Sequence, residues 1–381
     1  MLAVLLMLSP PPAVTAPAPE PAPAEEKEEK PALAFAFGDI WLTPILGPSY
    51  TPEMGFTLAA GGMVSWKSDK GSPRSNITAT VSYGTVGAGQ AYFKLTGYFL
   101  HDTLRIETEL GAKYMNDHFF GVGYEEGSTI PFGDETSKYQ RGWFSVRPQV
   151  LAQVAADFFV GGAIDFNGTN ATELNPLMAA HPMVVEQGTR FLNFGFGPIV
   201  QYDTRDFPQN AYRGIFLQGK IVYSLRGLGS QESYGLIDLD YRQYKPLGRL
   251  GKTLAWRVQF RNAGGETPWT ELPSMGSSND LRGYRGGQYR DDSFLYGVIE
   301  YRHMFTAGRG PTGAPRLSKH GFAAWVGAGV MGAGGSEISP PLPTLGIGYR
   351  FAAQNRMNVR IDYGTGRFEA QGVYVSFGEA F

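Results

Sequence analysis

The sequence predicts an all-β chain: a transmembrane antiparallel β-barrel of about sixteen strands, with an inward-folded loop after the eleventh. Composition is the first observation. The 51 glycines and 13% aromatic residues suit strands, turns and aromatic girdles, whereas each glycine costs a helix roughly 1 kcal/mol. The second observation is a steady alternation of apolar and polar residues, which is the period of a β-strand. The third is that these runs extend over about ten residues or more, long enough to cross a bilayer at a tilt. Strands of soluble sandwiches usually have about five or six residues.

Charge, cysteine content and hydropathy exclude several classes of protein. A net charge of −2 gives no reason to expect a polyanionic partner such as nucleic acid. Without cysteine, disulfides, zinc–thiolate sites and a lipid-anchored N-terminal cysteine are excluded within this sequence. A mean hydropathy of −0.20 is too polar for a helical membrane protein. It suits a membrane barrel, in which only alternate residues meet lipid.

The N-terminal residues have the pattern of a targeting segment. Residues 2–8 form an apolar run of signal-peptide length, far short of the ~20 residues that span a membrane as a helix. We expect a signal peptide at 1–16, cleaved after Ala16, and its missing basic start is consistent with a true start further upstream. Residues 17–35 are rich in proline, alanine and glutamate, a composition typical of a disordered linker. The barrel is expected over 36–381.

Period-two alternation is clearest in the segments 76–83, 254–261 and 358–363, each with one apolar face and one polar face. No convincing helical stripe follows residue 36. Long loops belong outside and short turns in the periplasm, so the long connections 125–138, 167–189 and 276–292 are expected outside. An even number of strands places both chain ends on the periplasmic side. Strands are expected near 51–66, 75–86, 90–100, 103–122, 139–154, 157–167, 190–205, 213–225, 232–245, 252–263, 266–275, 293–305, 321–332, 343–352, 356–365 and 371–381.

One connection has an unusual composition. Leu281, Arg282, Gly283 and Tyr284 set an arginine and a tyrosine among glycines, which let the backbone turn sharply. The guanidinium of Arg282 can make a bidentate bond to a carboxylate. We expect this loop to fold inward and to be pinned to the barrel wall. The alternative is a surface hairpin with a basic tip.

The inward loop needs a partner for its arginine. Alternation places Asp362, within Arg360–Gly364, on the lumenal face of the penultimate strand, which makes it the best candidate. Glu300 and Arg302 lie on the same kind of face in the strand after the loop, as alternative partners or as a neighbouring pair. The plainer reading is that all of these are ordinary lumenal charges.

A second cluster of charges lies near the middle of the chain. Asp203, Arg205 and Asp206 precede a proline, and Gly214 follows Arg213. The pattern is typical of a salt-bridged strand end that runs into a periplasmic hairpin. A divalent metal at the two aspartates is disfavoured, because Arg205 can neutralise them and no further ligands are suitably spaced. No metal and no cofactor are expected.

Catalytic motifs are not recognisable in the sequence. The five histidines are scattered, and none lies in the sequence beside a serine, a carboxylate pair or another histidine in a known arrangement. The glycine-rich segments at 327–329 and 346–348 fall within expected strands, whereas dinucleotide sites use a strand-to-helix turn. We therefore expect that the chain is not an enzyme. An outer-membrane hydrolase is kept as a hypothesis that a lipase assay would test.

These motifs together resemble the bacterial surface antigen superfamily, the family of outer-membrane barrel-assembly proteins of the BamA and TamA kind and of two-partner-secretion proteins. Leu281–Tyr284 resembles its inward-loop motif, which in the family follows strand eleven of a sixteen-stranded barrel. The terminal Phe381 resembles the signal that the outer-membrane insertion machinery reads. Further motifs resemble the family's pattern in the same order: Tyr50–Gly55 as the opening of the first strand, Asp203–Asp206 with Gly214 in mid-barrel, Glu300–Arg302 after the loop and Arg360–Gly364 in a late strand.

The sequence departs from the family pattern in two places. Family members commonly carry periplasmic POTRA repeats before the barrel, whereas here only the short linker precedes it, so the module that recruits clients is expected to be missing. Many members also have an aspartate in strand thirteen as a partner of the loop arginine. The matching position here is Val326, so Asp362 is the expected partner of the loop arginine.

The resemblance implies a protein that helps polypeptide, or lipid, to insert into or cross the bacterial outer membrane. In the implied mechanism the first and last strands pair weakly and open toward the bilayer. A first strand rich in glycine, with Gly55, Gly61 and Gly62, fits weak pairing. The implied partners are outer-membrane lipid and either unfolded outer-membrane protein clients or a periplasmic protein. The alternative function is a passive pore or structural barrel without assembly activity.

Overall fold

The computed structural model describes residues 35–381, apart from 52–53, 70–71, 249–250, 310–314, 333–336 and 355. The expected signal peptide and nearly all of the expected linker therefore lie outside the described residues. Within the described part of the chain, no helix is both long enough and apolar enough to cross a membrane.

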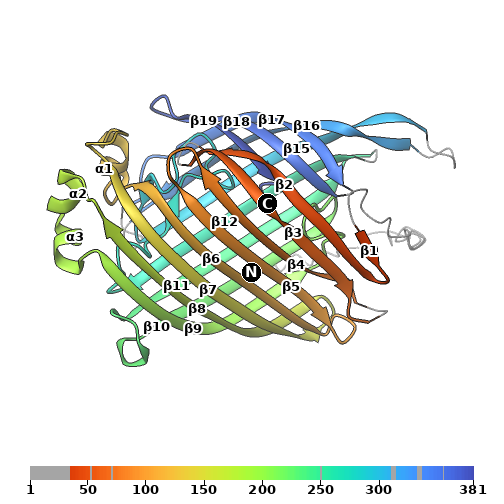
Figure 1. The fold of residues 1–381 in the computed structure, drawn as a ribbon, viewed down its shortest axis with the longest axis horizontal. Helices are drawn as coiled ribbons and strands as arrows, with labels where there is room; N and C mark the ends of the chain where they lie inside the picture. The colour runs from red at the N-terminus through yellow and green to blue at the C-terminus, as the bar shows by residue number, and fades with distance from the viewer. Residues whose placement is uncertain are drawn as a thin grey trace, which may run out of the picture. The chain divides into compact units, whose positions relative to one another are not determined.

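The described chain is a β-barrel, as predicted (Figure 1). Its main sheet has seventeen strands. One of them, β1 (Phe35–Phe37), pairs with β2 beside the ring. Each other strand pairs antiparallel with its neighbour along the chain, and β19 pairs with β2, so the ring returns to its start. The ring strands are β2 (Ile40–Thr51), β3 (Gly55–Lys67), β4 (Arg74–Gly84), β5 (Gly89–Phe99), β6 (Leu104–His118), β7 (Lys138–Ala155), β8 (Phe158–Thr172), β9 (Arg190–Asp203), β10 (Gly214–Ser224), β11 (Tyr234–Pro246), β12 (Lys252–Gly265), β15 (Ser293–Arg309), β16 (Pro315–Met331), β17 (Leu342–Gln354), β18 (Met357–Thr365) and β19 (Gln371–Phe377).

The strands bury their polar face and expose their apolar face. In β18, Asp362 is fully buried, whereas the neighbouring Ile361 and Tyr363 are 44% and 46% exposed. Large exposed apolar side chains also cover the outside of β3, β15, β16 and β17. This reversal of a soluble protein's pattern is expected where the outer face meets lipid and the lumen holds the charges.

Connections at the two ends of the ring differ in length. At one end, here the long-loop end, the chain makes the connections 119–137, 173–189, 225–233 and 266–292. They carry α1 (Tyr124–Thr129), α2 (Pro176–Ala180), α3 (Pro182–Gln187), the 3-10 turn η1 (Arg226–Leu228), and the two-residue strands β13 (Ser274–Met275) and β14 (Tyr289–Arg290). At the other, the short-turn end, the connections include 100–103, 156–157 and 204–213. The three connections predicted to be long therefore share one end.

One expected strand, 266–275, is wrong and one strand, β2, was missed, so the two errors cancel in the count. The first ring strand is β2, so Tyr50–Gly55 lies at the turn after it, and Gly55, Gly61 and Gly62 belong to the second ring strand. The segment 266–275 is not a ring strand, because its apolar residues pack in a loop and only 274–275 are extended. Strand eleven is β12, and the inward loop follows it as predicted. The short helices of the long-loop end were not predicted.

Candidate functional site: the pinned loop and the strand seam

The loop 266–292 is bonded to the wall of the barrel through its own backbone. Tyr374 of β19 accepts a hydrogen bond from the Gly283 N–H (3.0 Å) and donates to the carbonyl oxygen of Tyr284 (3.1 Å). Thr344 of β17 donates to the carbonyl oxygen of Arg282. Tyr284 in turn donates to the carbonyl oxygen of Pro343 (2.8 Å). The inward course predicted for Leu281–Tyr284 is present, and all four residues are buried.

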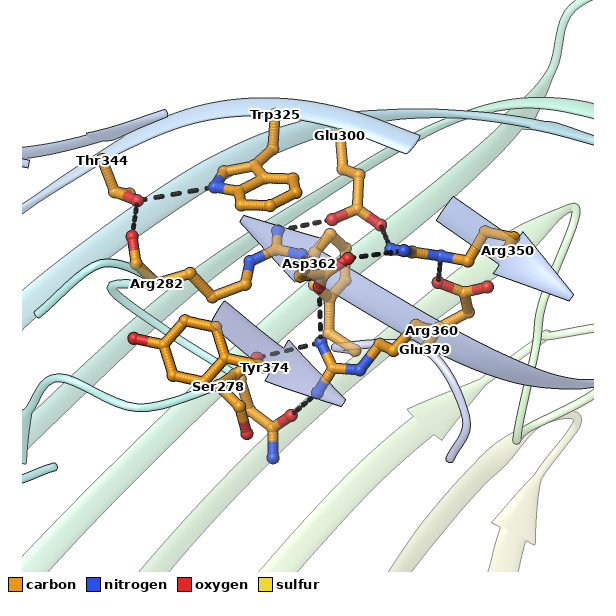
Figure 2. Close-up of polar contacts among 12 residues, drawn as sticks. Ser278, Arg282, Glu300, Trp325, Thr344, Arg350, Arg360, Asp362, Tyr374 and Glu379 are labelled. Carbon is orange, nitrogen blue, oxygen red and sulfur yellow. Dashed lines mark hydrogen bonds and ion pairs between the residues drawn. The ribbon is translucent and has the colours of Figure 1, made fainter. Parts of the chain in front are cut away.

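Arg282 is held by two carboxylates from different strands. One terminal nitrogen lies 2.9 Å from Asp362 of β18, and the other contacts Glu300 of β15 (Figure 2). All three side chains are at most 1% exposed. The two partners considered as alternatives from the sequence are thus used together. Because the guanidinium is planar and presents its donors as a fork, one arginine can bridge two strands in a way that a lysine cannot.

A wider ion network surrounds this bridge (Figure 2). Arg350 of β17 contacts Asp362 and lies 2.9 Å from Glu379, which follows β19. Arg302 lies 2.7 Å from Glu300, and Arg360 lies 3.1 Å from Asp362. Four arginines and three carboxylates are therefore buried together, and they join β15, β17, β18, the C-terminal residues and the loop. Removing one member of such a network leaves its partners as uncompensated charges, which is strongly destabilising.

The strand-thirteen position predicted from the sequence is wrong by one residue. Val326 is 60% exposed and faces outward. Its neighbour Trp325 is buried, and its ring lies 3.5 Å from the guanidinium carbon of Arg282. An aromatic face therefore occupies the place that an acidic partner would take, and it attracts the cation through its π-electrons.

Glycines make room for the pinned loop. A Cβ on Gly348 would lie 1.9 Å from a carboxylate oxygen of Asp362, and one on Gly364 would lie 2.7 Å from the backbone of Arg282. Gly283 has a φ of +117° and packs against the backbone of Thr365, so a side chain is excluded on both counts. The glycines in this part of the barrel allow the close approach of two backbones.

The loop has a second attachment, on the opposite wall. Trp269 is fully buried among Phe119, Tyr139 and Phe191, and its ring N–H donates to the carbonyl oxygen of Gly188 (3.0 Å). This contact ties the loop to the connections 119–137 and 173–189, so the three cover the long-loop end together.

Glu271 lies beside this second attachment. Its carboxylate accepts a bond from the Asn167 side chain (3.3 Å), which also donates to Asp165 (2.9 Å). Burial, together with the nearby Asp165 charge, raises the pKa of Glu271 to about 7. The residue lines a lumenal cavity of about 630 Å³ whose other lining residues include Arg147 and Lys220.

The seam where the ring closes is weakly paired. Between β19 and β2 the described residues contain one register pair, Val375 with Tyr50, whereas β2 and β3 are paired continuously from Trp41 to Thr51. Two causes are visible in the strands. β19 has seven residues against twelve in β2, and β2 contains Pro44 and Pro48, which lack N–H donors. Prolines are tolerated only where a strand's donors face no partner.

Residues of the mid-barrel motif lie at the short-turn end. Asp203 is held by Arg205 at 2.8 Å and by Arg105 at 3.3 Å. Asp206 instead pairs with Arg356, at 3.0 Å. Among the described residues, no group of three or more potential ligands could hold a metal ion. Gly214 has a φ of +109° and lies against the Thr204 carbonyl oxygen, which explains why a glycine follows this turn.

The Asp206–Arg356 pair joins distant parts of the ring. Arg356 belongs to the turn between β17 and β18 and stacks 3.8 Å from the ring of Tyr212. The connection 204–213 therefore reaches across the short-turn end. Phe381 packs there too: it is buried, and its ring lies 4.7 Å from the guanidinium carbon of Arg302. Its proposed role as an insertion signal stays a prediction.

Several members of the site were missed by reasoning from the sequence. Arg350 and Trp325 follow the alternation of their strands, so an arginine and a tryptophan on lumenal faces could have been found by parity. Glu379 lies beyond the end of β19, after Gly378 with a φ of +81°, where strand parity no longer applies. For Tyr374 the sequence predicts only a lumenal position and not its bonds to the loop backbone.

Comparison with known proteins agrees with this geometry. No curated protein matches the sequence. Among solved structures, the chain is similar to BamA from Haemophilus ducreyi lacking POTRA domains 1–3, with 11% identity and a TM-score of 0.60 over 88% of this chain and 70% of that one. It is also similar to CdiB from Escherichia coli (9% identity, TM-score 0.59, 91% and 63% of the chains) and to CdiB from Acinetobacter baumannii (12%, 0.50, 90% and 60%).

At these identities the structural likeness establishes the fold, and the chain spans 60–70% of the length of these solved chains. A family model described as the Omp85 superfamily domain matches residues 75–366, most of the sequence. This range includes the inward loop, both carboxylates that hold Arg282 and the mid-barrel charges. The chain belongs to the Omp85 superfamily.

Proposed function

We propose that this chain is an integral outer-membrane protein that helps polypeptides, or lipids, to insert into or cross the outer membrane. The observation that carries the proposal is the seam between β19 and β2, with its single register pair. An edge with few hydrogen bonds can open at low cost and can accept the strand of another chain. The long-loop end faces outward and the short-turn end faces the periplasm.

The pinned loop supports this function by keeping the rest of the barrel in shape. Arg282 and its network hold β15, β17, β18 and the C-terminal residues together on one side of the seam. On the other side, β2 is continuously paired with β3. An opening is therefore confined to the seam. The first strand contributes through Pro44 and Pro48 rather than through the glycines expected from the sequence.

Reconstitution tests this function. Proteoliposomes containing the full chain should speed the folding of an unfolded outer-membrane protein client, scored by its heat-resistant band on semi-native gels. The matched control is empty liposomes, and a second control carries an unrelated barrel of similar size. Equal client folding in all three preparations would contradict an insertion role. A crosslinked pull-down from the outer membrane would identify clients or a periplasmic partner.

A passive pore is the second candidate, and the charged lumenal cavity of about 630 Å³ favours it. Three connections cover the long-loop end, while residues 204–213 and Phe381 lie at the short-turn end. We therefore expect small and unsteady conductance in planar bilayers. A large, steady conductance of the parent protein would favour the pore.

We also propose that the chain is not an enzyme. The structure places His118 Nδ1 2.9 Å from Ser137 Oγ, a pair that the sequence did not indicate. Ser137 is fully buried and bonds the backbone of Gly133, so its hydroxyl has a structural partner and no access to substrate. A lipase assay of Ser137→Ala against the parent tests this, and a loss of measurable hydrolysis would contradict it.

A further inference from the structure

We propose that the outer face of β12, β15 and β16 at the short-turn end binds the headgroups of anionic phospholipids. The cations that would contact them are Lys252 and Arg316, on the outward face by strand alternation, and Lys319, on the opposite face of the β15–β16 extension beyond the ring. These three residues are here called the basic arc. The inference rests on the proposed outer-membrane placement and goes beyond it by assigning a lipid class and a site. The basic arc lies on strands other than the two that form the seam.

Charges at the short-turn end are segregated around the ring. Between Tyr241 and Gly265, and again between Tyr301 and Ser336, the sequence contains no aspartate or glutamate. Within the described residues, none of the three cations of the basic arc has an ion-pair partner, and Arg316 and Lys319 are exposed. Aspartates lie instead on the other side of the ring, where short-turn connections carry Asp69, Asp102, Asp157 and Asp206.

An aromatic belt borders the basic arc on the outward face. One row of paired residues crosses four neighbouring strands: Lys252, His303, Phe322 and Tyr349. A second row, nearer the short-turn end, pairs His320 with Phe351, whose ring centroids lie 5.6 Å apart. Aromatic rings of this kind concentrate at the level of lipid headgroups, where one part of the ring meets hydrocarbon and another meets water.

The β15–β16 hairpin, which carries Arg316 and Lys319, extends beyond the ends of β12 and β17. The pairing of β15 with β12 ends at His303, and that of β16 with β17 ends at His320. Arg316 and Lys319 therefore lie on a two-stranded extension, which Figure 1 shows projecting past the adjacent strands. Farther along the same outward face, Ile299, Val326 and Ile347 are 53–60% exposed. The order from apolar side chains through aromatic rings to cations matches the order from acyl chains to headgroups.

This order favours lipid over an acidic protein as the occupant. A protein partner would not require the cations to be aligned with a membrane-facing aromatic belt. A phospholipid with net negative charge satisfies both features at once, because its phosphate meets the cations and its glycerol region meets the rings.

The test measures lipid preference of the full chain reconstituted in phosphatidylcholine bilayers. Spin-labelled phosphatidylglycerol and spin-labelled phosphatidylcholine report the relative association constant of each lipid with the protein. The test variant is Arg316→Gln with Lys319→Gln. The matched control removes two exposed cations from the long-loop end, Arg190→Gln with Arg367→Gln. All substitutions are at exposed positions, and folding is checked by the heat-resistant gel band.

We expect the parent and the control to prefer phosphatidylglycerol. The test variant should lose this preference by about fivefold or more, because each cation near an anionic surface contributes about a fivefold affinity. Absence of a preference in the parent, or equal loss in test variant and control, would overturn the proposal. Binding of polyglutamate that phosphatidylglycerol does not displace would point to a protein partner and would also overturn it. The client-folding assay is scored separately, so the two proposals can fail independently.

Discussion

Arg282 connects the loop to several strands of the barrel wall. It is buried, bridges Asp362 and Glu300, stacks on Trp325 and accepts a bond at its own carbonyl oxygen from Thr344. We predict that Arg282→Ala lowers the free energy of unfolding by about 3 kcal/mol, since it leaves buried carboxylates uncompensated. Urea titration and the heat stability of the folded band on semi-native gels measure the loss.

A double-mutant cycle separates the pairing from general damage. Asp362→Ala alone should be comparably harmful, because Arg350 and Arg360 each lose one ion-pair partner as well. The double variant Arg282→Ala with Asp362→Ala should be no worse than either single variant. Additive losses would show that the two side chains act independently. Arg282→Lys should give an intermediate result, because the compact ammonium keeps the charge but lacks the two separated nitrogens that contact Glu300 and Asp362.

A substitution at Gly348 tests whether the ion network needs the space that a glycine leaves beside Asp362. We predict that Gly348→Ala destabilises the folded band about as much as Asp362→Ala, because the new Cβ would occupy the position of the Asp362 carboxylate. The control is Gly297→Ala on β15, where the Cβ would meet no atom within 4 Å. If both glycine variants behave alike, crowding at the ion network is not the cause.

Residue identities in the site were partly predictable. Asp362, Glu300 and Arg302 were found because strand alternation assigns side chains to the lumen, and that period is robust within a strand. Trp325 was missed because an error of one residue in register moves every side chain to the other face. Glu379 was missed because Gly378 turns the chain inward after the last strand, and packing rather than alternation decides its position.

The loop 266–292 contributes to the pH dependence of the fold through Glu271. Its Glu271 has a pKa near 7, raised by burial and by Asp165. The folded state thus holds this proton more tightly than the unfolded chain does. The resulting stability is fully present below the ordinary carboxyl pKa, and is lost as the pH rises through about 7.

We predict that Glu271→Gln, which imitates the protonated carboxyl, removes part of the pH dependence of thermal stability between pH 5 and pH 8. At pH 8 the variant should be more stable than the parent. The matched control is Glu266→Gln, an exposed glutamate in the same loop. Thermal scans at the two pH values decide: a variant with the parent's pH dependence would show that Glu271 does not titrate in this range.

Strands were predictable where composition and period agree. β4, β5, β12 and β18 fall close to their expected bounds. β2 was missed because Pro44, Gly47 and Pro48 are residues that strands disfavour. The segment 266–275 was mistaken for a strand because Trp269, Leu272 and Met275 are apolar for a different reason: they are buried inside the barrel end instead of facing lipid.

At the scale of the whole barrel, residues 204–213 reach across the short-turn end. Arg356 holds this connection through Asp206 and Tyr212. We predict that Arg356→Ala raises single-channel conductance in planar bilayers while leaving the heat stability of the band nearly unchanged. The control is Arg213→Ala, an exposed arginine in the same connection. Unchanged conductance in Arg356→Ala would show that this connection does not limit ion flow.

Function at this scale was the least predictable from residues. The family pattern indicated a barrel with an inward loop, and both are present. Loops cover both ends of the barrel through contacts between segments about 80 to 150 residues apart, such as Trp269 with Gly188 and Asp206 with Arg356. Alternation and composition describe neighbours along the chain, so they carry no information on such contacts.

If the seam between β19 and β2 opens when the protein acts, a reversible crosslink across it must stop that activity. The chain has no cysteine, so Tyr50→Cys with Val375→Cys places a single disulfide across the one register pair of the seam. The control, Tyr363→Cys with Val373→Cys, closes the neighbouring β18–β19 pair instead. In proteoliposomes, oxidation should abolish client folding by the seam variant, reductant should restore it, and the control should stay active in both states. Full activity of the oxidised seam variant, with its disulfide verified on the gel, would show that the protein acts without opening the seam.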